Sequence, residues 1–356
     1  MDKVWWEQVT RANSFIDKIV SAMLSEKSVV LVLPEHTPWC DRMQDAVENS
    51  LSKLNPSKSM KVIDSPQEKV GEFMLNRYCH EEQRLQYRAG KSHAEFLAKC
   101  EDTVLNSLYV WVRNIPEKLL PEWVGFLAEY HRNTSPERAS AVFVLETSDD
   151  KMRMKSVKGV VNISYSALMN TFDAYTFCIL AASDAADEIY KKNYLAELVY
   201  SVCGEDIELC AACIRQGTRF PKDPAGVLAE ILSGACRSDG SSFAYDVDEM
   251  NLEKRIWKTQ MKMLFPMIED YRGEFVGRYR KQIDCQLPFR NNSNDVVFSE
   301  PEEVEIGTLS FMAASKLISI DAKEHTRLHQ FKEARNTLAH LKILSLDEVY
   351  RILSGN

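Results

Sequence analysis

The chain has 356 residues, a formal net charge of −8 at pH 7 and 45% hydrophobic residues. These values are typical of a globular protein with two or three domains and an ample core. The negative charge argues against broad electrostatic attraction to nucleic acid. No apolar run approaches the roughly 20 residues of a membrane span, and Met1–Glu7 lacks the layout of a signal peptide. We therefore expect a cytoplasmic protein with no membrane partner.

The first half of the chain predicts an α/β domain of residues 1–170. Apolar residues recur at helical intervals from Trp5 to Met23, and short β-branched runs then alternate with helical stretches. The runs are residues 28–33, 60–63, 108–112, 141–145 and 160–163. Runs that are apolar on both faces and separated by helices are typical of a parallel sheet covered on both sides.

This arrangement resembles the core of a P-loop NTPase of the AAA+ or STAND kind. Residues 29–33 lie where the first strand would be, residues 108–112 where the Walker B strand would be, and residues 141–145 form the next strand. The helical stretches at 171–240 fit the lid of such a core. The chain resembles this core only in the order of its strands and helices.

The residues that carry nucleotide chemistry are absent from this layout. A phosphate-binding loop needs glycines, a lysine and a Ser/Thr for magnesium, but residues 33–41 contain no glycine and no lysine. The presumed Walker B strand ends in Arg113 and Asn114, without a carboxylate. We expect no nucleotide binding in the P-loop manner, and either a degenerate NTPase kept as a scaffold or an unrelated α/β domain.

The loop after the first strand has other features. Thr37 and Pro38 indicate the N-cap and the first position of a helix. Glu35, His36 and Asp41 gather at the carboxyl end of the strand, where sites of α/β proteins usually lie. A hydrolase built on these three residues is an alternative, but no nucleophile is evident beside them.

The middle of the chain predicts a helical region at 171–240 that ends in a polar linker at residues 237–242. Cys210 and Cys213 form a C-x-x-C pair, but apolar residues surround it at helical spacing and no second pair lies at zinc-binding distance. Nine scattered cysteines suit reduced thiols. We expect these two to pack in a buried helix, and we expect neither a metal nor a cofactor.

Helical periodicity continues to the end of the chain and predicts an all-α domain of residues 248–356. Between residues 251 and 290, nine Lys/Arg stand against five Asp/Glu. Arg278, Arg280 and Lys281 could contact an RNA backbone, or could form a solvated stripe on a long helix.

A late helix carries Arg335, Asn336 and His340. At about 100° per residue, His340 lies roughly 140° from the centre of the apolar arc, with Asn336 as its i,i+4 neighbour and Arg335 at the boundary. The arc consists of Phe331, Ala334, Leu338 and Leu341. His340 is therefore expected to point away from the core of its own helix, although a solvated His and Arg would show the same spacing.

The pattern Arg335-Asn336-x-x-x-His340 resembles the R-x(4–6)-H signature of the HEPN superfamily, all-helical domains found in many prokaryotic toxins and RNA-processing nucleases. The resemblance covers about residues 248–356. It implies an HEPN-like helical bundle, metal-independent cleavage of RNA in a toxin or antiviral-defence system, and a homodimer, because the motifs of two protomers commonly face one another. Many HEPN-like domains serve instead as scaffolds.

The resemblance also implies a role for each motif residue. His340 would be the general acid or base, because its ordinary pKa lies near neutrality. Arg335 would bind the phosphoryl oxygens with its forked donors, and Asn336 would orient the histidine or the substrate. The alternative is a non-catalytic adaptor that assembles with larger protein partners.

Overall fold

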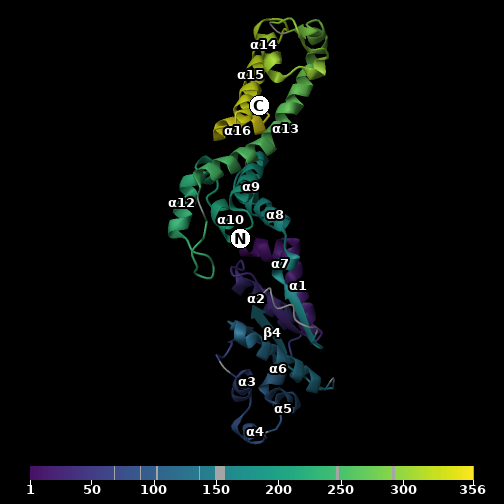
Figure 1. The fold of residues 1–356 in the computed structure, drawn as a ribbon, viewed down its shortest axis with the longest axis vertical. Helices are drawn as coiled ribbons and strands as arrows, with labels where there is room; N and C mark the ends of the chain where they lie inside the picture. Colours follow the sequence, from purple (N-terminus) through teal and green to yellow (C-terminus); the bar gives the residue numbers. More distant parts are fainter. Residues whose placement is uncertain are drawn as a thin grey trace. The chain divides into compact units, whose positions relative to one another are not determined.

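The computed structural model describes residues 1–67, 69–88, 90–101, 103–135, 137–148, 157–245, 248–290 and 293–355. These residues form two compact units (Figure 1). Met1–Asp173 and Ser238–Gly240 form the first unit, and Ala174–Arg237 and Ser241–Asn356 form the second. Most of the expected 171–240 region thus belongs to the same unit as residues 248–356.

The first unit is built on a five-stranded parallel sheet with the order β2-β3-β4-β1-β5. The strands are β1 (Ser28–Val32), β2 (Ser59–Asp64), β3 (Leu108–Arg113), β4 (Val142–Thr147) and β5 (Val160–Ser164). A strand lies at each of the five predicted runs, which confirms the parallel α/β region. The central strands β3, β4 and β1 are the most buried, as their unbroken apolar runs require.

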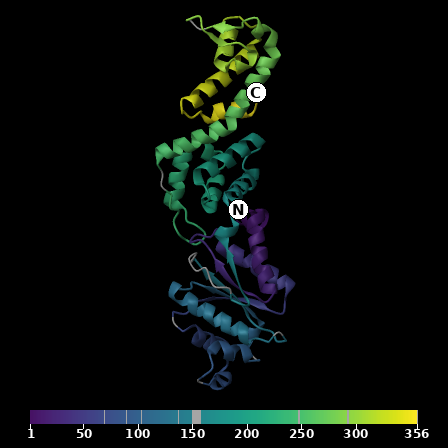
Figure 2. The same cartoon turned by 45° about the vertical axis from the view of Figure 1, so that its right-hand side comes forward.

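Helices cover both faces of this sheet (Figure 2). The helices of this unit are η1 (Val4–Gln8), α1 (Thr10–Leu24), α2 (Cys40–Leu54), α3 (Val70–Tyr78), α4 (Glu81–Leu85), α5 (His93–Lys99), η2 (Val104–Ser107), η3 (Glu117–Leu119), α6 (Leu120–Asn133) and α7 (Tyr165–Leu168). Side chains of α3, α5 and α6 form one core with the strands, in which Trp123 and Phe143 are fully buried. Helix α1 packs against α2, β1 and β5.

The start of the chain differs from the single helix that its periodicity predicts. A π-helical turn, η1, precedes α1, and Val9 between them is extended. The indole of Trp6 is buried and donates a hydrogen bond to Pro38 O at 3.0 Å. The N-terminal segment is therefore fixed on the loop that follows β1.

That loop also differs from the prediction that Thr37 caps the next helix. Helix α2 begins at Cys40, and its N-cap is Trp39 in a left-handed conformation with φ of 44°. The Thr37 hydroxyl donates instead to Pro34 O at 3.1 Å. The Pro38 carbonyl accepts a hydrogen bond from the Trp6 indole. Local capping preferences cannot predict this contact, because the two residues are distant in sequence.

The second unit is helical, apart from a short hairpin of β6 (Phe289–Arg290) and β7 (Val296–Phe298). Its helices are α8 (Thr171–Ala181, which begins in the first unit), η4 (Ala182–Asp184), α9 (Ile189–Cys203), α10 (Ile207–Ile214), α11 (Arg219–Lys222), α12 (Pro224–Gly234), α13 (Glu249–Asp284), η5 (Pro301–Glu303), α14 (Ile306–Ala314), α15 (Ala322–Ala339) and α16 (Leu346–Leu353). The 36-residue α13 packs against α9, α15 and α16. Within the described part of the chain, no helix is long and apolar enough to cross a membrane.

Candidate functional site

Helix α15 ends in a hydrogen-bonded turn that positions His340. The Lys342 N–H donates to Thr337 O at 3.1 Å, and the Leu341 N–H donates to Leu338 O at 3.1 Å. This pair of bonds defines a Schellman motif, in which His340 is the C-cap and Leu341 takes the left-handed conformation, with φ of 58°. Glycine is the usual residue at that position, because a Cβ atom is disfavoured there.

One position of the predicted apolar arc was wrong. Phe331, Ala334 and Leu338 are buried, but the side chain of Leu341 is 72% exposed. The helix ends at Ala339, so Leu341 no longer follows the helical rotation on which the arc was drawn.

Two side chains of α13 hold this turn from the inside. The Trp257 indole donates to Leu338 O at 2.9 Å. The Gln260 amide, only 2% exposed, donates to Leu344 O at 3.0 Å and to the Tyr194 hydroxyl at 3.3 Å, and its oxygen accepts from Leu344 N at 2.7 Å. The backbone is thus fixed on both sides of His340.

The structure brings two of the three predicted motif residues together. Arg335 is half-buried, and its guanidinium donates to Asn336 Oδ1 at 3.5 Å and to Glu305 Oε2 at 3.3 Å. The His340 side chain is exposed and, among the described residues, makes no hydrogen bond or ion pair with either of them. Its connection to the motif is a backbone bond from its N–H to Asn336 O, at 3.0 Å.

The predicted basic residues of α13 are largely neutralised. Arg278 forms an ion pair with Glu324 at 2.8 Å, and Arg280 forms one with Glu302. Lys281 is exposed and has no ion pair within the described ranges. Two of the three charges are therefore shared with carboxylates.

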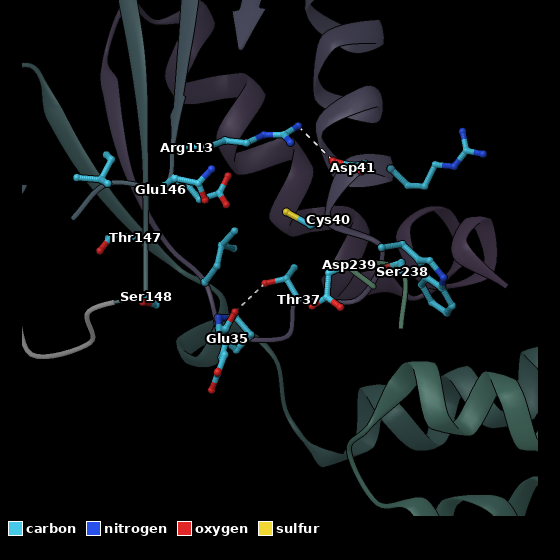
Figure 3. Close-up of a pocket in the computed structure, with 16 residues that line it drawn as sticks. Glu35, Thr37, Cys40, Asp41, Arg113, Glu146, Thr147, Ser148, Ser238 and Asp239 are labelled. Carbon is cyan, nitrogen blue, oxygen red and sulfur yellow. Dashed lines mark hydrogen bonds and ion pairs between the residues drawn. The ribbon is translucent and has the colours of Figure 1, made fainter. Parts of the chain in front are cut away.

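A second candidate site lies in the first unit, where a cleft of about 660 Å³ opens at the carboxyl ends of β1, β3 and β4 (Figure 3). It is lined by Leu33, Pro34, Glu35, Thr37, Trp39, Cys40, Asp41, Arg42, Arg113, Asn114, Ile115, Glu146, Thr147, Ser148, Ser238 and Asp239. Glu35 and Asp41 line it, as their place after β1 led us to expect. His36 lies 3.2 Å from the Asp239 carboxylate (Nδ1 to Oδ2).

Glu146 and Arg113 are residues of this cleft that sequence reasoning did not select. Glu146 Oε2 accepts from the Trp111 indole at 2.9 Å and from Gln44 Nε2 at 3.1 Å, and burial raises the pKa of its carboxyl. Arg113 lies 3.2 Å from Asp41 and also donates to Gln44. A polar residue at the end of each apolar strand is the signal that could have identified them.

The chemistry available in this cleft is limited. Burial raises the pKa of the Cys40 thiol to about 12, so this thiol is protonated at neutral pH and is a poor nucleophile. Arg113 lies at the end of β3, where magnesium-binding chemistry would need a carboxylate. The cleft offers carboxylates and a guanidinium but no activated thiol nucleophile.

No metal centre is apparent: the described residues contain no group of three or more His, Cys, Asp or Glu arranged to hold an ion. Cys210 and Cys213 are buried in α10, as predicted. Comparisons with protein-family models and with curated proteins found no match for this chain. Its function must therefore be argued from residues and geometry.

Proposed function

We propose that the chain is an HEPN-like, metal-independent ribonuclease of a prokaryotic toxin or antiviral-defence system. One observation supports the proposal above all: His340 is exposed on a turn that Trp257 and Gln260 fix from the buried side. A catalytic imidazole needs access to the substrate and a firm support; the exposed ring of His340 has the first, and the fixed backbone that carries it supports the second.

The proposed reaction uses the three motif residues. The RNA 2′-hydroxyl attacks the adjacent phosphate and the bond from phosphorus to the 5′-oxygen breaks, which leaves a 2′,3′-cyclic phosphate and a 5′-hydroxyl. His340 either takes the proton of the 2′-hydroxyl or gives one to the departing 5′-oxygen, and Arg335 stabilises the negative charge of the transition state. Arg335 must then exchange Glu305 for a phosphate. The Glu305 side chain is 60% exposed, and an exposed ion pair of this kind contributes only about 0–1 kcal/mol, so the exchange costs little. Asn336 holds the guanidinium during the exchange.

A second copy of the chain would complete the site. In one copy the His340 ring is exposed, and the neighbouring side chains of Leu341 and Ile343 expose apolar surface. Burial of these side chains against a partner would be favourable and would exclude water from the imidazole. For the first unit we propose a degenerate NTPase-like scaffold, which the parallel sheet and the missing phosphate loop support.

The test is an RNA cleavage assay with the purified full-length protein in the presence of a chelator. Arg335→Ala and His340→Ala should each abolish cleavage. His325→Ala, an exposed histidine of the same helix, and Arg351→Ala, an exposed arginine of α16, are the matched controls and should cleave normally. Cleavage that persists in both motif variants, or none in the native protein on several RNAs, would refute the ribonuclease.

A second function, a non-catalytic adaptor, is favoured by a different observation. Arg335, Arg278 and Arg280 already form ion pairs with carboxylates of the same chain. Under this alternative the turn at His340 binds a protein partner. His340→Ala would then weaken assembly, measured by sedimentation, and no cleavage would be found in any variant.

A further inference from the structure

A second cleft in the first unit carries a concentration of positive charge. It has a volume of about 480 Å³ and lies beside β2, the outermost strand at one edge of the sheet. Its lining consists of Lys61, Arg77, Tyr78, Cys79, His80, Val104 and Leu108. The three basic residues come from three different elements: Lys61 from β2, Arg77 from α3 and His80 from the N-cap of α4.

These basic side chains are exposed, and none of them pairs with a carboxylate among the described residues; the His80 ring accepts a hydrogen bond from the Gln83 N–H. Lys61, Arg77 and His80 form no ion pair within the part of the chain that the structure describes, and no Asp or Glu lines the cleft. The acidic residues near them in sequence, Asp64 of β2 and Glu81 and Glu82 of α4, are not part of the lining. In a chain of net charge −8, Lys61 and Arg77 therefore make this cleft locally positive, and an anion bound there would be attracted to both.

Tyr78 adds an unused hydrogen-bonding group at the same place. Tyr78 is only 8% exposed, and its hydroxyl has no partner of good hydrogen-bond geometry among the described residues. Burial raises the pKa of this phenol, although the nearby Arg77 guanidinium opposes the rise, and the phenol therefore keeps its proton. Buried polar groups without partners are rare in folded proteins and call for an explanation.

We propose that this cleft binds a phosphoryl group. A phosphomonoester has three terminal oxygens and close to two negative charges, which match three donors that line the cleft from separate elements. A carboxylate offers two oxygens and a single charge, and would leave one of the three donors without a partner. Val104, 54% exposed, and Leu108 form an apolar wall that suits the organic part of the ligand.

This site goes beyond the ribonuclease proposal and does not depend on it. The strand-end cleft of the same unit cannot serve the purpose, because Glu35, Asp41, Glu146 and Asp239 line it. The match requires a terminal phosphate, as in a phosphomonoester, because a phosphodiester of a nucleic-acid backbone has only two free oxygens and one negative charge.

The experiment is a calorimetric titration of the full-length protein with inorganic phosphate and with phenyl phosphate. We expect saturable binding in the millimolar range or tighter. Arg77→Gln and Lys61→Gln should each weaken it about tenfold, the typical loss for one charge-assisted hydrogen bond. Arg88→Gln and Lys53→Gln are matched controls, since both residues are exposed and outside the cleft, and should bind as the native protein does.

Three results would overturn the proposal: no saturable binding of either phosphate, equal binding by Arg77→Gln and the Arg88→Gln control, or displacement of phenyl phosphate by a short single-stranded RNA without terminal phosphates. All four substitutions affect exposed side chains, and unchanged thermal melts will show that the variants are folded. Such an RNA presents only singly charged phosphodiesters, so it should not displace phenyl phosphate.

Discussion

Replacement of Gln260 by alanine should destabilise the second unit strongly. The side chain is buried in α13 and satisfies three groups at once: Leu344 N, Leu344 O and the Tyr194 hydroxyl. Leu344 is itself only 5% exposed, so water cannot readily replace the lost partner. With about 1 kcal/mol for each buried group left unsatisfied, Gln260→Ala should lower the free energy of unfolding by about 3 kcal/mol.

The assay is urea unfolding followed by circular dichroism, with hydrogen exchange of the Leu344 amide as a local probe. Thr259→Ala is the control, because Thr259 is equally buried but bonds only to Arg255 O in its own helix. That variant should lose about 1 kcal/mol. If the two variants are equally stable, or if the Leu344 amide stays protected in Gln260→Ala, Gln260 does not hold the turn beside His340.

Three further outcomes are expected. Leu341→Gly should raise the free energy of unfolding by about 1 kcal/mol, because glycine adopts the left-handed conformation without the strain of a Cβ atom and the lost side chain is exposed. A lower midpoint of unfolding in urea would contradict this. Burial lowers the pKa of His131, whose Nε2 lies 2.8 Å from Ser28 Oγ, below its ordinary value of 6.5. The folded state then binds fewer protons than the unfolded state, so stability is fully present above pH 6.5 and declines as pH falls; His131→Asn should flatten this decline in urea titrations at pH 5 to 7. Tyr78→Phe should leave stability unchanged or raise it by up to about 1 kcal/mol without phosphate, since its hydroxyl has no partner of good geometry in the described residues. A clear loss of stability in thermal melts would contradict this and point to a hydrogen bond with Arg77.

The sheet could be predicted from the sequence because its strands are local and distinct. Each central strand is an unbroken apolar run between helices, and such runs need no knowledge of distant residues. The buried positions of α15 followed from periodicity for the same reason. That prediction was wrong only at Leu341, where the helix had already ended.

The features that escaped prediction depend on contacts between distant residues. The partners of Arg278 and Arg280 lie 46 and 22 residues away, so their neutralisation cannot be read from the balance of charge within α13. Trp39 takes a left-handed conformation beside Pro38, whose carbonyl accepts the indole of Trp6, 32 residues earlier. Arg113 and Glu146 become members of one cleft only when β3 and β4 pair.

The first unit is discontinuous along the chain, and this decides how it can be studied in isolation. Ser238–Gly240 belong to it, although 64 residues of the other unit separate them from Asp173. A fragment that stops near residue 173 would lack Asp239 and leave His36 without that carboxylate. Recombinant versions should therefore keep this tripeptide, for instance by joining it through a short artificial loop.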